Sequence, residues 1–257
     1  MVSGVRHVVD RGQAYPVVRF AGVLDAASAP LVRSAVRGVL ADQPEAVVVD
    51  VRELISEEPK AAEVLADLAG EAAEWPCARL ALCATGDAQD WRLPGLAIWP
   101  TPQDAFAALG RPRPGHFMSE MLDPVIGAAR RSRELVTEAC ARWELAELAG
   151  PACIVITEMV NNVVAHARTE MTVLLGLHGE AMTVAVRDLS TTIPVFTGSP
   201  VPVTSYGGRG LLLIDSVARR WGSMPLPGGK IVWAALEGEP EVAGNTREAG
   251  MAHPTVG

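Results

Sequence analysis

The stretch EMVNNVVAHA, Glu158 to Ala167, decides how the second half of this chain is interpreted. It ends a helical pattern that starts near Pro151, with apolar residues three and four positions apart. Glu158, Asn162 and His166 are spaced by four, so a regular helix places them in one polar row beside its apolar face. The stretch therefore predicts a half-buried helix whose polar flank meets either solvent or a cleft.

The polar row has the residue types of a site for a hard cation. The side-chain oxygen of Asn162 is a neutral ligand, and Mg²⁺ usually takes few protein ligands and completes its shell with phosphate oxygens and water. Glu158, one turn away, is placed to orient or deprotonate a hydroxyl group. His166 is less diagnostic. On this helix alone, a solvated polar flank explains the pattern as well as a metal site does.

Two later features are compatible with a nucleotide. Asp188 ends an apolar strand pattern, and a carboxylate there can accept a hydrogen bond from an exocyclic amine such as that of adenine. Gly207, Gly208 and Gly210 precede a helical pattern, where glycines let backbone N–H groups approach a phosphate at the helix N-terminus. Each feature alone is also explained by an ordinary turn. Because both features follow the polar-row helix in this order along the chain, we interpret the three together.

Composition excludes some classes of function. The 257 residues are 49% hydrophobic and 20% charged, with a net charge of −8, which argues against nucleic acid as the main partner. The cysteines show no CxxC spacing and sit among apolar residues, which favours reduced, buried thiols. No signal peptide and no apolar run of membrane-spanning length is evident, so we expect a cytoplasmic protein without a membrane contact.

The segment GRPRPGH, residues 110–116, is the clearest domain boundary, because prolines and glycines follow a completed helical pattern. We expect an α/β (α+β) protein with a domain at 1–110, a linker at 111–116, a second domain at 117–237 and a disordered tail at 238–257. In the first domain, strands are expected at 16–20, 46–51, 79–84 and 96–99, and helices at 29–40, 61–75 and 102–109. Thr101 is the expected N-cap of the last helix.

The second domain has a different order of elements. Helices are expected at 123–143 and 151–167, then strands at 171–177 and 182–188, a helix at 210–221 and a strand at 230–236. The Pro-, Ser- and Thr-rich connection between Asp188 and Gly207 is long for a compact domain, so it is either a functional lid or disordered.

This order, with these residues, resembles the GHKL ATPase superfamily, and more closely its anti-sigma-factor serine kinase branch, over residues 123–236. The resemblance implies an α/β sandwich with a mixed sheet and an ATP lid, and it implies ATP and Mg²⁺ as cofactors. EMVNNVVAHA is similar to the N box, which implies Glu158 as the catalytic base, Asn162 as the Mg²⁺ ligand and His166 beside the cofactor. VRDLS is similar to the adenine-binding box, which implies Asp188 as the adenine contact.

GGRGLLLID is similar to the glycine box of that superfamily, which implies cofactor contacts from Gly208, Arg209, Gly210 and Leu211. One departure concerns the last strand. The family usually has a threonine near the adenine where Ile231 stands, and loss of that hydroxyl is expected to weaken adenine binding or move a water.

The first domain resembles a STAS domain, the fold of anti-sigma-factor antagonists, over residues 15–109. Gly22 to Asp25 matches the early strand and turn, and Asp50 matches the end of the next core strand. Antagonists carry a phosphorylatable serine at the next helix start, where this chain has Pro59 and Lys60. The resemblance therefore implies a domain that docks or regulates and is not itself a substrate.

Together these resemblances imply an anti-sigma-factor-type serine protein kinase. It would use Mg·ATP to phosphorylate a serine on an antagonist (STAS) partner, or it would sequester a sigma factor. The alternative is a nucleotide-gated protein-binding module without phosphotransfer, because binding and transfer use the same groups. A homodimer through the first helix of the second domain is also implied, with Arg130, Arg131 and Arg133 on its polar side. A histidine kinase is disfavoured, because the nearest histidine, His116, lies in the linker.

Overall fold

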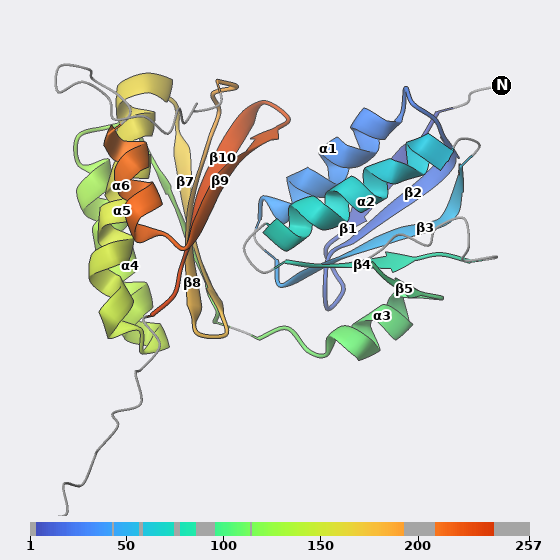
Figure 1. The fold of residues 1–257 in the computed structure, drawn as a ribbon, viewed down its shortest axis with the longest axis horizontal. Coiled ribbons are helices and arrows are strands. Elements are labelled where there is room, and N and C mark those ends of the chain that lie inside the picture. The colour runs from blue at the N-terminus through green and yellow to red at the C-terminus, as the bar shows by residue number, and fades with distance from the viewer. Residues whose placement is uncertain are drawn as a thin grey trace, which may run out of the picture.

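A computed structural model describes residues 4–42, 44–56, 59–74, 78–85, 96–113, 115–192 and 209–238. They form two five-stranded sheets, one before and one after the segment between α3 and β6. Figure 1 shows the two halves side by side, each with its own helices. The expected α/β class is confirmed. The expected lid, apart from residues 189–192, and the expected tail after residue 238 lie outside the described residues.

The N-terminal sheet has the strand order β1-β2-β3-β4-β5. Only β1 and β2 pair antiparallel, and the other neighbours are parallel. Its strands are β1 (Arg6–Asp10), β2 (Val17–Leu24), β3 (Ala46–Ser56), β4 (Arg79–Cys83) and β5 (Ala97–Trp99). Its helices are α1 (Ala29–Leu40), α2 (Pro59–Glu74) and α3 (Pro102–Leu109).

Side-chain alternation along β2 and β3 divides the N-terminal core into two layers. Val47 and Val49 pack with residues of α1 and α2, whereas Ala46 and Val48 pack with Ala105 of α3. A strand covered on both faces reads as a continuous apolar run, and β3 does so from Ala46 to Val49. Thr101 caps α3 as expected, since its hydroxyl accepts a hydrogen bond from the Asp104 amide at 3.2 Å.

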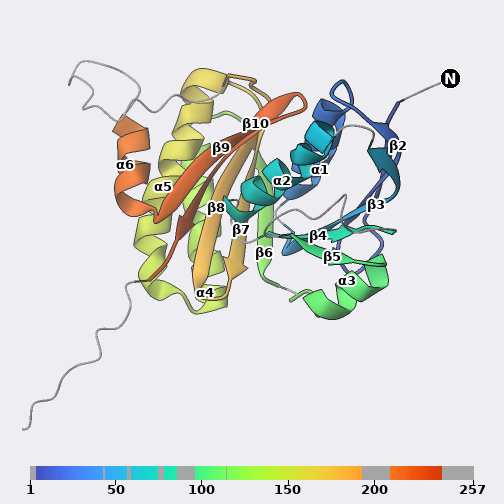
Figure 2. The ribbon, with the colours of Figure 1, turned by 45° about the vertical axis from the view of Figure 1, so that its right-hand side comes forward.

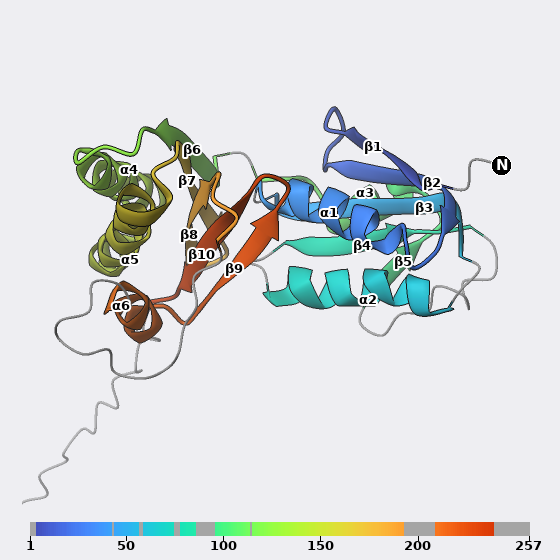
Figure 3. The same cartoon turned by 90° about the horizontal axis from the view of Figure 1, so that it is seen from above.

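The C-terminal sheet has the order β6-β7-β8-β10-β9. Its strands are β6 (Phe117–Leu122), β7 (Met171–His178), β8 (Ala181–Asp188), β9 (Arg220–Leu226) and β10 (Gly229–Leu236). The helices α4 (Ala128–Trp143), α5 (Ala149–Asn162) and α6 (Arg209–Val217) lie together on one face (Figure 3).

The expectation of a mixed C-terminal sheet was wrong for the described strands. All four pairings are antiparallel. The crossover through α6 returns β9 in the same direction as β8, but β9 lies at the sheet edge and β10 occupies the place between them. The two strands that run in the same direction are therefore not neighbours.

Three strands were not expected from the sequence: β1, β6 and β9. All three lie at sheet edges, where exposed positions break the apolar signal, as in the alternating exposure of β6. Two helix ends also differ. Helix α4 begins at Ala128, not near Asp123, and α6 ends at Val217 because the following residues enter β9.

A continuous helical stretch runs from Ala146 to Ala167 and joins a short 3₁₀ turn, α5 and a π-helical turn. The stretch is 22 residues long, and an 18-residue window within it has a mean hydropathy of 1.5, so it is long and apolar enough to cross a membrane by length and composition. The expectation that no stretch reaches that length was therefore wrong. The stretch lies between α4 and α6 with its apolar face on the sheet, and core helices of soluble proteins pass the same test.

The second face of the C-terminal sheet meets the N-terminal domain. Alternate residues of β10, Ile231, Trp233 and Ala235, share one core cluster with residues of α1 and α2. Figures 1 and 2 show α1 and α2 on the side of this sheet opposite to α4, α5 and α6. An ion pair between Arg187 and Asp42, with 3.5 Å between Nη1 and Oδ1, joins the domains at the rim. The sheet is thus covered on both faces.

Candidate functional site

Helix α5 presents Glu158 and Asn162 on consecutive turns. Both residues are half-buried, whereas the adjacent Asn161 is exposed. The buried residues of the same helix, Val155, Ile156, Met159 and Val160, fix its rotation by packing on the sheet. The polar pair is therefore held on the flank of α5, at the edge of the helical layer.

The first turn of α6 lies directly against Glu158. A Cβ atom built on Gly210 would lie 2.7 Å from Oε2 of Glu158, closer than van der Waals contact permits. Helices α5 and α6 approach each other here because Gly210 has no side chain. This contact brings the predicted base and the predicted glycine turn together, although they are far apart in sequence.

Replacing Gly210 with alanine tests this contact. We expect a small effect on the free energy of unfolding, because the atom that must move is the flexible end of Glu158. If Glu158 is the base of a phosphotransfer reaction, transfer is expected to fall by at least about tenfold, because a catalytic carboxylate displaced by an ångström loses its alignment. Denaturant unfolding and a phosphotransfer assay measure the two effects, with Gly150→Ala, a position open to a Cβ, as the control. A large loss of stability would contradict the prediction.

The remaining glycine-box residues are only partly described. Gly207 and Gly208, and the side chain of Arg209, lie outside the described residues. Leu211 is buried among the residues under α6, so its side chain is part of the core and only its backbone could face a phosphate.

The regular polar row ends at Asn162. The next turn, Val163–Ala167, is π-helical and closes with a hydrogen bond of 2.7 Å from the Arg168 amide to the Val163 carbonyl. Arg168 has φ 55°, in the left-handed region. A π turn holds more residues than an α turn, so His166 departs from the line of Glu158 and Asn162, and it is exposed. The single row of three predicted from a regular helix is therefore a row of two.

Asp188 lies at the end of β8 and is 2% exposed. Its Oδ1 accepts a hydrogen bond from the Ser190 amide at 2.7 Å and another from Nζ of Lys230 at 2.9 Å. Lys230 is also buried, and its Nζ lies 3.4 Å from the Ser190 carbonyl oxygen. The carboxylate that was predicted to contact adenine thus already holds a buried ammonium group.

Lys230 is the site residue that sequence reasoning missed. Asp188 and Lys230 are directly paired across β8 and β10, so their side chains leave the same face of the sheet. Gly229 allows the close approach, since a Cβ there would lie 2.1 Å from the Asp188 carbonyl oxygen. The alternation of β10 was visible in the sequence, but its pairing partner and register were not.

The position of Ile231 corrects the expectation about adenine. Its side chain is fully buried in the cluster shared with the N-terminal domain, on the sheet face opposite to α4, α5 and α6. Val186 and Val232 mark the other face, on the side of Asp188. Ile231 therefore does not adjoin the predicted nucleotide site, and the departure that bears on adenine is Lys230.

Replacing Ile231 with threonine tests whether this position has any effect on nucleotide binding. We expect a loss of about 1–3 kcal/mol in the free energy of unfolding, because a hydroxyl enters an apolar interface without a partner. Nucleotide affinity is expected to stay unchanged. Calorimetric titration alongside Lys230→Thr, on the opposite face, provides the matched comparison. A gain in affinity from Ile231→Thr alone would show that this side chain does act on the nucleotide.

The side chains of Glu158 and Asn162 suit Mg²⁺ bound through phosphates better than a metal held by the protein alone. Within the described ranges there is no group of three His, Cys, Asp or Glu residues that could hold a metal. Asn162 offers one neutral oxygen beside Glu158, which fits a cation that takes most of its ligands from phosphate and water. Asn162 and Glu158 therefore fit the predicted Mg²⁺. The carboxylate of Asp188, which was predicted to contact adenine, is already bonded to Lys230.

Two of the described cysteines match the expectation of buried thiols, and Cys153 is half-buried. Cys83, Cys140 and Cys153 are free, and Cys77 lies outside the described residues. Burial raises the pKa of the Cys83 thiol to about 12 and that of Cys140 to about 11. These two thiols are therefore protonated and unreactive at neutral pH.

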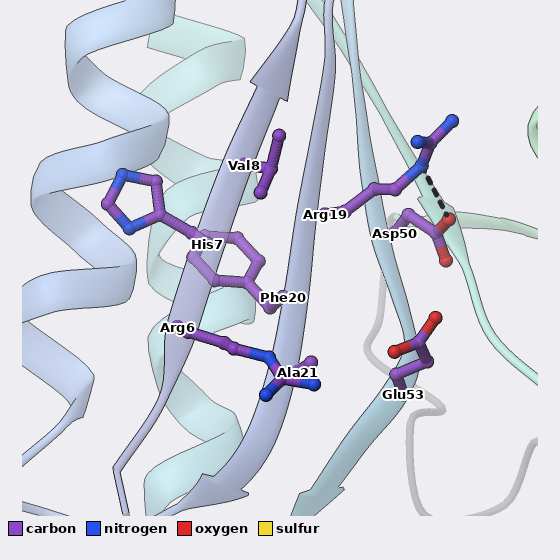
Figure 4. A pocket seen from close by; sticks show the side chains of 8 residues that line it. All are labelled: Arg6, His7, Val8, Arg19, Phe20, Ala21, Asp50 and Glu53. Atoms are coloured by element: carbon purple, nitrogen blue, oxygen red, sulfur yellow. Dashed lines mark ion pairs between the residues drawn. The ribbon is translucent and has the colours of Figure 1, made fainter.

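The N-terminal domain has a polar pocket of its own (Figure 4). The carboxylate of Asp50, 5% exposed, receives two hydrogen bonds of 2.8 Å from Arg52. Arg19 reaches the same carboxylate, with 3.7 Å between Nε and Oδ2. Asp50 was predicted to end a core strand, and this was wrong, because β3 continues to Ser56; the carboxylate lies within the strand and is held by arginines of its own sheet.

The arginines suggested for a dimer face have partners within the chain. Arg130 pairs with Glu134 at 3.0 Å, and Arg131 pairs with Glu120 at 2.7 Å. Arg133 donates to the Thr157 hydroxyl at 3.2 Å. These contacts neither require nor exclude a second copy, and the homodimer stays a prediction.

Comparison with known proteins gives partial likenesses of fold. No family model matches the chain, and no curated protein matches it. Among solved structures, an anti-sigma factor antagonist from Mycobacterium paratuberculosis is 23% identical, covering 42% of this chain and 97% of that one, with a TM-score of 0.36. The RsbU and RsbW domains of a Mycobacterium tuberculosis protein are 21% identical, covering 49% of this chain and 32% of that one, with a TM-score of 0.36.

A third similar structure is an uncharacterized Shewanella loihica protein described as having a SpoIIAA-like fold. It is 21% identical and covers 43% of this chain and 97% of its own, with a TM-score of 0.32. The first protein is, by its description, an anti-sigma factor antagonist. Each likeness spans less than half of this chain, and the activities of those proteins are not transferred to it.

Proposed function

We propose that this protein is a regulatory, Mg·ATP-dependent protein serine kinase of the anti-sigma-factor type. The observation that carries the proposal is the contact between Glu158 and Gly210. It places a half-buried carboxylate at the start of a glycine-opened helix, with Asn162 one turn further along α5. A carboxylate, a neutral oxygen ligand and a helix N-terminus are the groups that phosphoryl transfer to a hydroxyl requires.

Each residue has a defined role in this proposal. Asn162 holds the cation, and the backbone amides at the start of α6 face the phosphates. Glu158 accepts the proton of the attacking serine hydroxyl. Bound Mg·ATP supplies the phosphoryl group. The N-terminal domain, which resembles an antagonist but has Pro59 and Lys60 at the acceptor position, docks or regulates and leaves the acceptor serine to a separate protein.

Calorimetric titration with ATP, with and without Mg²⁺, tests the site. We expect binding that requires Mg²⁺ and that falls at least about tenfold in Asn162→Ala, since a direct charge-assisted contact is lost. Asn161→Ala is the matched control, because the same side chain is removed from an exposed position on the same helix. Failure of the intact, folded chain to bind Mg·ATP would refute the proposed function.

A second candidate function is a nucleotide-gated binding module without phosphotransfer. The contact between Glu158 and Gly210 serves this candidate equally, because a carboxylate that only packs against α6 would leave nucleotide binding intact without transfer. The two candidates differ in one assay. Incorporation of phosphate into an antagonist-type protein supports the kinase, whereas Mg·ATP binding without incorporation supports the module.

The proposed partners follow from the same resemblance. They are a STAS-type antagonist, a sigma factor or both, in the cytoplasm, with a second copy of this chain as a further candidate. Co-purification with an antagonist in the presence and absence of Mg·ATP tests whether the nucleotide controls the contact.

A further inference from the structure

A cavity of about 480 Å³ lies where the two domains and their connection meet. Glu45 and Arg79 line it from the N-terminal domain, and Leu177, His178 and Gly179 line it from the β7–β8 turn. The connecting segment contributes Arg111, Arg113 and His116. Figure 1 shows this segment passing between α3 and the turn at the end of β7 and β8. The cavity volume is in the range of small-molecule sites.

Several buried polar atoms at this junction have no hydrogen-bond partner among the described residues. They are the hydroxyl of Tyr15, Nδ1 of His116 and Nε2 of His178. Tyr15 is 2% exposed; burial and then the charge of Glu45 raise the pKa of its hydroxyl, and Arg79 and Arg113 lower it. His116 and His178 also line the cavity, so each has an unused hydrogen-bonding nitrogen beside it.

The charge of the cavity is positive. Three arginines, Arg79, Arg111 and Arg113, line it together with one carboxylate residue, Glu45. The carboxylate is engaged, because its Oε1 accepts a hydrogen bond of 2.8 Å from the Arg113 amide. An excess of two positive charges matches a phosphate monoester, which carries about −1.5 to −2 at neutral pH.

We propose that this junction cavity binds a small phosphate monoester, with Arg111 and Arg113 on the phosphate and His116 and His178 as hydrogen-bond donors. Guanidinium groups bind phosphate oxygens through parallel N–H donors, which makes arginine the preferred residue for such a contact. The ligand would bridge both domains and their connection. The site is separate from the one proposed for Mg·ATP, which lies on the flank of α5.

The histidines give the site a distinctive dependence on pH. Burial lowers the pKa of His178, the nearby His116 lowers it further, and Glu45 raises it. The other charged groups that line the cavity are Arg79, Arg111 and Arg113. A bound anion stabilises the protonated imidazole, so it raises this pKa and binds more tightly as pH falls. Sulfate is a suitable probe, because its own charge is constant over this range.

The test is an NMR titration of the histidine Cε1–H signals of the full chain with sodium sulfate, at about pH 6 and about pH 8. Chloride holds the ionic strength constant. We expect the His116 and His178 signals to shift and saturate, with tighter binding at the lower pH. The double variant Arg111→Ala/Arg113→Ala is expected to weaken binding at least about tenfold. The double variant Arg130→Ala/Arg142→Ala removes the same charge from exposed positions on α4 and serves as the control.

Three outcomes would overturn the proposal. They are unmoved His116 and His178 signals, equal weakening by both double variants, and competition by saturating Mg·ATP, which would assign the anion to the nucleotide site. A parallel titration with glycerol 3-phosphate addresses the organic part of the ligand. Inorganic phosphate, titrated in the same way, is the reference. Tighter binding of glycerol 3-phosphate than of inorganic phosphate supports a monoester, and weaker binding contradicts it. Loss of Mg·ATP binding in Asn162→Ala would leave these results unchanged, so the two proposals fail separately.

Discussion

Replacing Asp188 with alanine is expected to lower the free energy of unfolding by about 3–5 kcal/mol. Lys230 is the reason. The two side chains are 1% and 9% exposed, and Nζ lies 2.9 Å from Oδ1. Removing the carboxylate leaves a buried ammonium group without its counter-ion, and it also removes the acceptor of the Ser190 amide. Denaturant unfolding at neutral pH, followed by far-ultraviolet circular dichroism, measures the loss.

A double variant distinguishes the lost ion pair from a lost turn. Asp188→Ala/Lys230→Met removes both charges, and replacing a buried pair with apolar groups is often neutral. We expect it to recover most of the stability lost by Asp188→Ala. An equal loss in the single and double variants would mean that the bond to Ser190, and not the pair with Lys230, stabilises the strand end.

The pair also shows what the sequence could and could not predict. Helix α5 was predictable because its apolar residues repeat at helical spacing, and Glu158 and Asn162 follow from that spacing alone. Asp188 was identified as a strand-end carboxylate for the same local reason. Lys230 was not, because its role depends on β10 lying beside β8 in one register, and no local pattern encodes that pairing.

Contacts between the domains could not be predicted from the sequence either. Ile231 and Trp233 read as ordinary strand residues, yet they lie in a core cluster shared with α1 and α2. A strand covered by its own helices and a strand covered by another domain have the same apolar pattern. The face on which a β10 side chain lies therefore decides whether its substitution affects the proposed nucleotide site or the contact between the two domains.

The end of α5 is a further case in which local spacing was insufficient. A regular helix would have aligned His166 with Asn162, but the π turn from Val163 to Ala167 redirects it. π turns arise from tertiary demands at helix ends and recur at functional sites. Here the turn follows directly on the residue proposed to hold Mg²⁺, and it leaves the position of Asn162 itself unchanged.

Replacing Glu158 with glutamine is expected to lower phosphotransfer by about 10²–10⁴-fold, the usual contribution of a general base. Glutamine keeps the size and shape of the side chain, so its contact with Gly210 is retained and the free energy of unfolding should change little. Mg·ATP binding is expected to persist, because Asn162 and the start of α6 are untouched. The measurement is a single-turnover transfer of phosphate to an antagonist-type protein. Glu170→Gln, an exposed residue after the same helical stretch, is the control.

The comparison with Asn162→Ala gives this prediction its discriminating power. If Glu158 is the base, Glu158→Gln impairs transfer with binding intact, whereas Asn162→Ala impairs both. Unchanged transfer in Glu158→Gln would place the base elsewhere. The Glu158 carboxylate would then have only a packing role against α6, as the close approach of Gly210 permits. A wild-type chain that binds Mg·ATP and transfers nothing would identify the binding module.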